Sequence, residues 1–445
     1  MDSFTVEITS LGSAGEGVAV LPSGKKLFVD SPVIPGEICE VEITSEKNKF
    51  ARGKCIDLVR SSDARILPYG GEVPGANLAH ISYDMQLKIK HDRVRDCLTR
   101  VGGFEPSFVD AIMRDIVPSE RVYHYRNHMQ YSLRDGRFCL KSQGSNTDVP
   151  VEDSPLEYEV FGYVRNVLSD AFSDYPTRLF DGVVLRGSER TGEVLIELVS
   201  YADMPSEVVI RDAGAYVKAT DMAGKLSGIK VEGILLRISN TATEKRTRGG
   251  KRVVLYGADH YTEVLCGQKF KVKAGAFFQV NVPQAEVLYG LAASDDCEGR
   301  LWDLYCGTGT IGLSMVREGQ KLIGVDISPE AIASAKENAL TARVDAGFIC
   351  KPASRITSLL ADIAPSDMVV VDPPRAGLEF SLVNALLENR PAEISYISCD
   401  PATMARDLKL LTAGGCYGVR SVTPVDLFPC TAHVETVAMI YRVSP

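Results

Sequence analysis

Apolar and polar residues alternate in short runs over the first 60 residues of the chain. The runs TVEITSLG, GVAVL, KLFVD, EICEVEITS and ARGKCIDLV are separated by turns that contain glycine, proline or lysine. Alternation with a period of two predicts half-buried strands, and several short strands in close succession are typical of a small barrel. We therefore predict a β-barrel over residues 1–62. Small barrels of this kind often bind RNA on one face.

The next part of the chain, residues 63–262, reads as a β-rich central domain. Alternating runs such as HYRNHMQYSLRDGRFCL, GVVLRGS, EVLIELVS and RVVLYGADH predict its strands. A connecting helix is expected near 83–101, where apolar residues follow helical spacing and a Gly-Gly pair ends the pattern. A second helix is expected around 156–174.

From about residue 263 the pattern changes to buried apolar strands that alternate with helical segments. The strand-like runs GRLWDLY, KLIGVD, SDMVVVD and ISYIS are each followed by a segment with helical periodicity. This order is typical of a doubly wound, mostly parallel sheet. The predicted fold class is thus α/β, with a C-terminal doubly wound domain over 263–445 behind the two β-rich parts.

Composition narrows the class of protein. The 445 residues are 45% hydrophobic and 24% charged, which is ordinary for globular domains. No signal peptide or membrane-spanning run is apparent, and the 11 cysteines show no spacing typical of a zinc site. We expect a cytoplasmic protein with reduced thiols, no membrane partner and a monomeric state.

The net charge of −9 argues only weakly against nucleic-acid binding, because local clusters of cations decide such contacts. Basic runs occur at residues 45–54, 88–95 and 243–252. A single basic run of this kind is more often part of a solvated loop or helix face. Together, we expect the first and third to form an RNA track in which Lys245, Arg246 and Arg248 take part.

The stretch YISCDPATMARDL places Cys399 where a strand should stop and a helix should begin. Backbone N–H groups and the dipole at a helix N-terminus favour the thiolate form of a cysteine. Cys399 is therefore a candidate nucleophile, although an arbitrary cysteine is more often a buried structural one.

Two further strand ends carry carboxylates beside a glycine-rich turn. In DLYCGTGTIGL, Gly307 and Gly309 allow a ligand to approach the backbone closely, and one βα unit later Asp326 could accept ribose hydroxyls. These residues alone leave a dinucleotide-binding site open. Asp372, followed by two prolines in VVVDPPRAGL, favours instead a stiff loop held against a reacting nucleotide or cofactor.

In this order the motifs DLYCGTGTIG, GVD, DPPR, SCDP and HVET, with FFQVN ahead of them, resemble the RNA uridine-5-methyltransferase family. The resemblance covers nearly the whole chain. It implies an N-terminal, OB-like TRAM barrel, a class I Rossmann-like methyltransferase domain, S-adenosyl-L-methionine as cofactor and RNA as partner. It also implies cofactor contacts by Gln279, Tyr305, Thr310, Asp326 and Asp372, with Cys399 as nucleophile and Glu435 as general base. Cys306, inside the glycine-rich turn, is interpreted as structural.

The chemistry that the resemblance implies requires one thiol and one base. Uracil C5 is too weak a nucleophile to take a methyl group unaided, whereas addition of a thiolate at C6 turns the base into an enolate. A base must then remove the C5 proton so that the thiol can leave. The target atom is hidden in stacked RNA, so the uridine must be flipped out.

The chain departs from many family members at their iron–sulfur motif. Val73 and Ala76 stand about where two cysteine ligands would fall, and Ser154 replaces another. Because such a cluster needs thiolate ligands, we predict no iron–sulfur cluster and no other metal.

Two other functions remain open. A cytosine-5 RNA methyltransferase also uses a cysteine nucleophile, usually after a proline, whereas Cys399 follows Ser398. An RNA-binding or assembly protein with a vestigial methyltransferase domain is the other alternative. The sequence does not distinguish rRNA from tRNA as the substrate.

Overall fold

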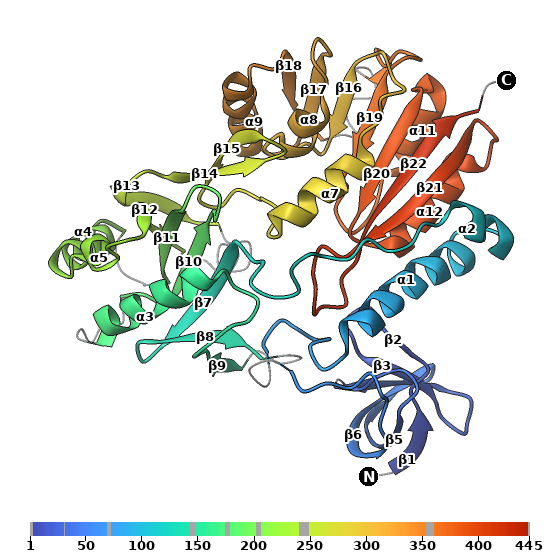
Figure 1. Ribbon diagram of the computed structural model, residues 1–445, viewed down its shortest axis with the longest axis horizontal. Coiled ribbons are helices and arrows are strands. Elements are labelled where there is room, and N and C mark those ends of the chain that lie inside the picture. The colour runs from blue at the N-terminus through green and yellow to red at the C-terminus, as the bar shows by residue number, and fades with distance from the viewer. Residues whose placement is uncertain are drawn as a thin grey trace.

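The structure is a computed structural model that describes residues 3–30, 32–68, 73–142, 147–173, 179–201, 206–239, 249–352 and 360–443. Figure 1 shows an N-terminal barrel in blue, a middle sheet in green and a C-terminal sheet in orange and red. The division of the chain at residues 62 and 262 remains a prediction.

The N-terminal sheet has the strand order β1-β5-β6-β4-β3-β2. Its two edge strands, β1 and β2, are separated in sequence only by Ile8 and Thr9, and the Thr9 N–H donates to the Val18 carbonyl of β3. The sheet therefore curls onto itself as a barrel around apolar side chains such as Leu27 and Val41. The strands are β1 (Ser3–Glu7), β2 (Ser10–Leu11), β3 (Gly17–Val20), β4 (Lys26–Asp30), β5 (Ile38–Glu46) and β6 (Phe50–Arg60).

The middle sheet has the order β13-β12-β11-β10-β7-β8-β9, and among its pairs only β11 and β12 run parallel. Its core holds the aromatic rings of Phe172, Phe180 and Tyr216. The elements are β7 (His128–Arg134), β8 (Arg137–Lys141), β9 (Asp148–Pro150), α3 (Glu159–Ser173), β10 (Gly182–Gly187), β11 (Glu193–Ser200), α4 (Ser206–Ala219), α5 (Met222–Lys225), β12 (Lys230–Ile238) and β13 (Lys251–Gly257). The hairpin of β14 (His260–Leu265) and β15 (Gln268–Lys273) and helix α7 (Val282–Ala292) follow.

The C-terminal sheet has the order β18-β17-β16-β19-β20-β22-β21, parallel from β18 to β20 and antiparallel at β22 and β21. Because parallel strands end at one edge, the turns after β16, β17, β19 and β20 lie together there. The elements are β16 (Leu301–Leu304), α8 (Thr310–Met315), β17 (Leu322–Asp326), α9 (Pro329–Ala342), β18 (Ala346–Cys350), β19 (Met368–Val371), α11 (Phe380–Asn389), β20 (Glu393–Ser398), α12 (Pro401–Thr412), β21 (Tyr417–Val425) and β22 (Glu435–Arg442).

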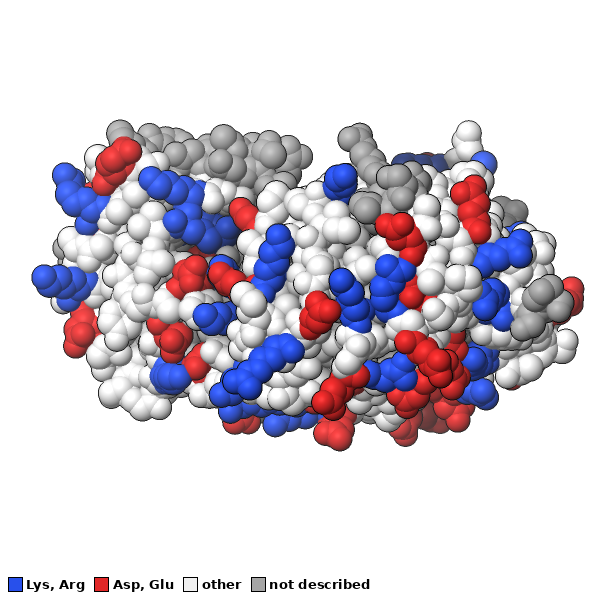
Figure 2. Space-filling model, turned by 90° about the horizontal axis from the view of Figure 1, so that it is seen from above, with Lys and Arg blue, Asp and Glu red and all other residues white. Residues whose placement is uncertain are grey.

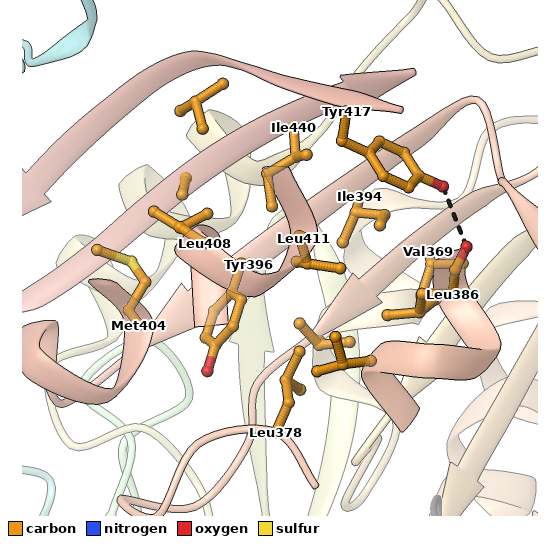
Figure 3. Packing of buried hydrophobic residues seen from close by; sticks show 14 of the residues in the cluster. Val369, Leu378, Leu386, Ile394, Tyr396, Met404, Leu408, Leu411, Tyr417 and Ile440 are labelled. Atoms are coloured by element: carbon orange, nitrogen blue, oxygen red, sulfur yellow. Dashed lines mark hydrogen bonds between the residues drawn. The ribbon is translucent and has the colours of Figure 1, made fainter. Parts of the chain in front are cut away.

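Two early helices, α1 (Tyr83–Arg100) and α2 (Pro106–Ile112), pack on the C-terminal sheet. Val94 and Leu98 of α1 join the same apolar core as Leu408 and Leu411 of α12. Figure 3 shows part of this core around Tyr396 and Tyr417, whose hydroxyl donates to the Leu386 carbonyl. The packing fixes α1 beside the edge at which the C-terminal strands end.

Charged side chains of both signs are interspersed on the face shown in Figure 2. Lys245, Arg246 and Arg248 of the expected RNA track lie outside the described residues. Arg252, from the same basic run, is paired with Glu197 at 2.8 Å. None of the helices in the described part of the chain is both long and apolar enough to cross a membrane.

Candidate active site

The glycine-rich turn after β16 is held by Asp326 at the end of β17. One Asp326 carboxylate oxygen accepts the Gly307 N–H at 2.9 Å, and the other accepts the Ser328 N–H at 2.8 Å. Gly307 and Gly309 have φ of 54° and 82°, a region that costs glycine little. Tyr305, just before them, has φ of 73°, which is rare for a bulky residue and typical of functional turns.

A cavity of about 650 Å³ opens beside this turn. Gly307, Thr308, Asp326 and Ser328 line one side, and residues of β13 and of the turn after β15 line the other. Its volume lies in the range of small-molecule sites, and the carboxylate at its wall suits sugar hydroxyls. Phe277, 73% exposed, adds an apolar surface. These residues fit a nucleoside-containing cofactor.

Two carboxyl groups lie at neighbouring strands: Asp303, inside β16, is buried, and Asp372, directly after β19, is half-buried. Burial raises the pKa of Asp372 to about 7. Burial, followed by the fields of Asp372 and Asp326, likewise raises the pKa of Asp303 to about 7, against the Gly312 N–H that it accepts at 2.8 Å. Sequence reasoning did not single out Asp303, although it begins the glycine-rich motif.

Tyr289 of α7 is a second residue that sequence reasoning missed. Its hydroxyl interacts with the side chains of Thr310 and Gln279 and lies near Asp372 and Asp303. Tyr289 is 2% exposed, and helical periodicity marked it only as an apolar position. Tyr289 thus connects Gln279 and Thr310, two of the residues expected to contact the cofactor.

Tyr305 stands apart from that meeting point. Its hydroxyl lies near Glu379 and Asp407, and burial is the main cause that raises its pKa to about 12. Of the five expected cofactor contacts, Asp326 lines the cavity, Gln279 and Thr310 adjoin Tyr289, and the charge of Asp372 acts on both Tyr289 and Cys399.

The register of the C-terminal sheet brings the chain at Cys399 close to the start of the strand that carries Glu435. β20 pairs antiparallel with β22, and Ser398, its last residue, pairs with Thr436. Cys399 is the next residue after this pair and Glu435 is the residue before Thr436, and the charge of Glu435 acts on the Cys399 thiol, which agrees with their closeness. The fields of Glu435, Asp372 and Arg375 all act on the thiol.

The expectation that the helix N-terminus favours the thiolate is wrong for this state of the protein. Burial, then the carboxylates of Glu435 and Asp372, raise the pKa of Cys399 to about 11. Asp400 caps α12 and accepts the Ala402 N–H at 2.9 Å and the Thr403 N–H at 3.3 Å, so these donors do not reach the thiol. Arg375, which sequence reasoning also missed, lowers the pKa.

Glu435 is 6% exposed. Burial and the nearby Asp372 raise its pKa to about 8, while Arg375 opposes the shift. A carboxyl group with a pKa near neutral pH can both accept and release a proton, as a general base requires. Cys306, in contrast, is 3% exposed, and burial and Asp303 raise its pKa, as expected for a structural thiol.

The loop before Glu435 is bound by α1 and by the segment ahead of it. The Gln86 side chain accepts the Cys430 N–H at 2.9 Å, and Lys90 donates to the Phe428 carbonyl at 3.0 Å. Asn77 accepts the Ala432 N–H at 2.9 Å. In Figure 1 this red loop reaches down beside the blue helix α1. The N-terminal half of the chain thereby positions a C-terminal site residue.

The segment that departs from the iron–sulfur motif forms a small apolar core. Val73 and Ala76 are 7% and 6% exposed and pack with Tyr125, Leu156 and Cys430. Cys430 is the one thiol of that cluster, so its residues do not fit an iron–sulfur cluster. Among the described residues no group of three His, Cys, Asp or Glu could hold a metal ion.

The chain is similar to known proteins over nearly its whole length. Residues 245–443 match the family model described as tRNA (uracil-5-)-methyltransferase, and residues 2–56 match the TRAM domain. Proteins of Clostridium tetani and Gloeobacter violaceus, both named as RNA methyltransferases, are each 32% identical. The first alignment covers 98% of this chain and 96% of that protein, and the second 99% and 96%.

A solved structure is similar over nearly the same length. It is the Pyrococcus abyssi tRNA (uracil-54, C5)-methyltransferase in complex with S-adenosyl-L-homocysteine. The TM-score is 0.75 at 25% identity, covering 98% of this chain and 100% of that one.

Proposed function

Since this chain belongs to the S-adenosylmethionine-dependent RNA uracil-5-methyltransferase family, we propose that it methylates C5 of one uridine in structured RNA through a covalent Cys399 adduct. Membership confirms the predicted family, the Rossmann-like and TRAM architecture, the cofactor and RNA as the substrate.

The observation that carries the proposal is the closeness of Cys399 and Glu435 at the edge where the strands of the C-terminal sheet end. In the proposed reaction the Cys399 thiolate adds to C6 of a flipped uridine. Bound S-adenosylmethionine would supply an electrophilic methyl group to C5. Glu435 then takes the C5 proton, and the C6–S bond breaks to release 5-methyluridine and the thiolate.

Each other residue of the site has a proposed part. Asp326 would accept the ribose hydroxyls of the cofactor. Gln279 and Thr310, joined by Tyr289, would hold its other end, and Asp372 would hold cofactor or base where the two meet. The Tyr305 backbone, at its unusual φ, would shape the turn. Arg375 would favour the charged forms of Cys399 and Glu435.

A methyl-transfer assay with trapped adducts tests the proposal. Cys399→Ala should abolish turnover yet retain cofactor binding, and activity above about a tenth of wild type would contradict covalent catalysis. Glu435→Gln should stall elimination, so a protein–RNA adduct resistant to denaturant should accumulate. If no such adduct forms, Glu435 is not the base that removes the C5 proton.

Identifying the methylated nucleoside tests the two other functions. A vestigial domain would transfer no labelled methyl from S-adenosylmethionine, and a cytosine-5 enzyme would yield 5-methylcytidine. The Pyrococcus abyssi neighbour acts on a tRNA uridine. Mapping 5-methyluridine in the RNA of a deletion strain by mass spectrometry decides between tRNA and rRNA for this chain.

A further inference from the structure

We propose that Arg93, Arg126, Arg375 and His433 together bind one backbone phosphate of the RNA next to the target uridine, an inference that rests on the proposed function. These four residues, here called the phosphate cluster, come from four separate segments: α1, the residues before β7, the loop after β19 and the loop before β22.

The loop before β22 is the centre of the cluster. His433 is exposed, lies two residues before Glu435, and packs its ring against Phe428 with 6.1 Å between centroids. Arg93 donates to the carbonyl of the preceding residue, Ala432, at 3.0 Å. A ligand held at His433 is therefore next to the proposed base.

The electrostatic surroundings of His433 are cationic. His433 keeps access to solvent, but neighbouring atoms desolvate part of its ring; this partial burial, followed by the charges of Arg375, Arg93, Lys90 and Arg126, lowers its pKa to about 4. Lys90 already has Asp426 as its partner. The other three are arginines, which stay charged at any physiological pH.

None of the four cluster residues forms an ion pair with a carboxylate of the described chain, although the protein has 58 acidic and 49 basic residues. Other partly buried arginines do have such partners, for example Arg65 with Glu37 and Arg300 with Asp367. The Arg126 Nε is closed to solvent and makes no hydrogen bond to a described residue. Cations that converge without forming a salt bridge to a described carboxylate favour an anion from outside the chain.

A phosphodiester is the anion that fits the position. Guanidinium groups bind phosphate oxygens through paired N–H donors, and such bonds are stronger than neutral ones. Arg375 also acts on Cys399 and Glu435, which places the cluster on the substrate side of the catalytic pair. The cofactor cavity is lined by other residues, so the cofactor carboxylate is not the expected ligand.

Salt dependence of RNA binding tests the cluster directly. The probe is a fluorescent 15-nucleotide single-stranded RNA with one uridine, measured by anisotropy over a range of KCl concentrations. Arg93→Met and Arg126→Met should each flatten the slope of log K against log salt by up to about 0.7, the value for one single-strand phosphate contact, whereas His433→Gln, which replaces a neutral imidazole, should change the slope little by itself. Because they share one phosphate, the triple variant should lose little more than the largest single effect.

Arg95→Met is the matched control, since Arg95 lies on the same helix but is paired with Asp110 at 2.8 Å. Its slope should equal that of wild type. A triple variant with an unchanged slope would overturn the inference, as would equal losses in the control.

Titration of His433 gives a second, independent readout on the wild-type protein with inorganic phosphate as probe. The His433→Gln variant assigns its imidazole signal among the six histidines by NMR. Phosphate should raise the titration midpoint of His433, and an unchanged midpoint at saturating phosphate would also refute the site. Neither the salt slope nor the His433 titration depends on methyl transfer. If the wild-type protein formed no 5-methyluridine, the proposed function would be contradicted, whereas the phosphate cluster would still be judged by these two measurements.

Discussion

Lys90 of α1 and Asp426, directly after β21, form an ion pair in which both side chains are closed to solvent. The two residues are 336 positions apart in the sequence. Burial lowers the pKa of Lys90, and the field of Asp426 opposes that shift. The pair ties the helix to the loop that ends at Glu435, so it links a structural contact with the geometry of the proposed base.

Lys90→Met should destabilise the protein by about 3–5 kcal/mol, because it leaves a buried carboxylate without its partner. Turnover should fall with it as the loop before Glu435 loses its anchor. Thermal unfolding and the methylation rate measure the two effects. Lys88→Met, which removes only an exposed pair with Asp92, is the control and should change neither. Equal stability of Lys90→Met and wild type would contradict the anchoring role.

The methylation rate should rise with pH through the pKa of Glu435, which is about 8. Only the carboxylate form of Glu435 can accept the C5 proton, and its raised pKa leaves it mostly protonated at lower pH. Because the Cys399 thiolate is the nucleophile and the pKa of its thiol is raised further, to about 11, the rate should continue to rise above the pKa of Glu435. Single-turnover rates at saturating cofactor measure this profile. A methylation rate that does not change between about pH 6 and about pH 8 would contradict this prediction.

Glu435→Gln should stabilise the fold at high pH. The pKa of Glu435 is raised from 4.5 when unfolded to about 8 when folded, so its favourable contribution is complete below 4.5 and is lost as pH rises to 8. Glutamine has no charge to bury, so the variant should melt a few degrees higher than wild type at pH 9, for a gain of about 1 kcal/mol or more. At pH 4 the difference should vanish.

Tyr289→Phe should weaken cofactor binding by about tenfold, because it removes the hydroxyl that joins Gln279 and Thr310 and so costs about 1.4 kcal/mol. Isothermal titration with S-adenosyl-L-homocysteine measures it. Tyr261→Phe is the control: Tyr261 is equally buried, but in the β14–β15 hairpin, and its loss should leave cofactor affinity unchanged. RNA affinity should stay the same in both variants.

The protein purified without oxygen should be colourless and contain no stoichiometric iron. The apolar residues Val73 and Ala76 stand about where many family members carry cysteine ligands, and both pack in a small apolar core. Elemental analysis and the visible spectrum provide the measurement. Stoichiometric iron together with a visible absorption band would contradict this prediction and would show that thiols elsewhere in the chain bind a cluster.

Local pattern was enough to predict the elements and the order of the site motifs. Alternation indicated the strands of the barrel and middle sheet, and apolar runs followed by Gly307, Asp326, Asp372 and Cys399 indicated strand ends. These features depend on residues close together in the sequence, so the sequence alone is enough to predict them. Because parallel strands share an edge, the convergence of these turns could also be expected.

Contacts between distant residues were decided only by the tertiary structure. The closeness of Cys399 and Glu435 depends on how β20 pairs with β22, and no local sequence pattern predicts that pairing. The thiol pKa was predicted in the wrong direction, because the helix N-terminus is local whereas burial and the field of Glu435 are not. Likewise, the sequence pattern predicted only that Tyr289 and Lys90 lie on helices. Tertiary packing brings the Tyr289 hydroxyl to Gln279 and Thr310 and the Lys90 ammonium group to Asp426.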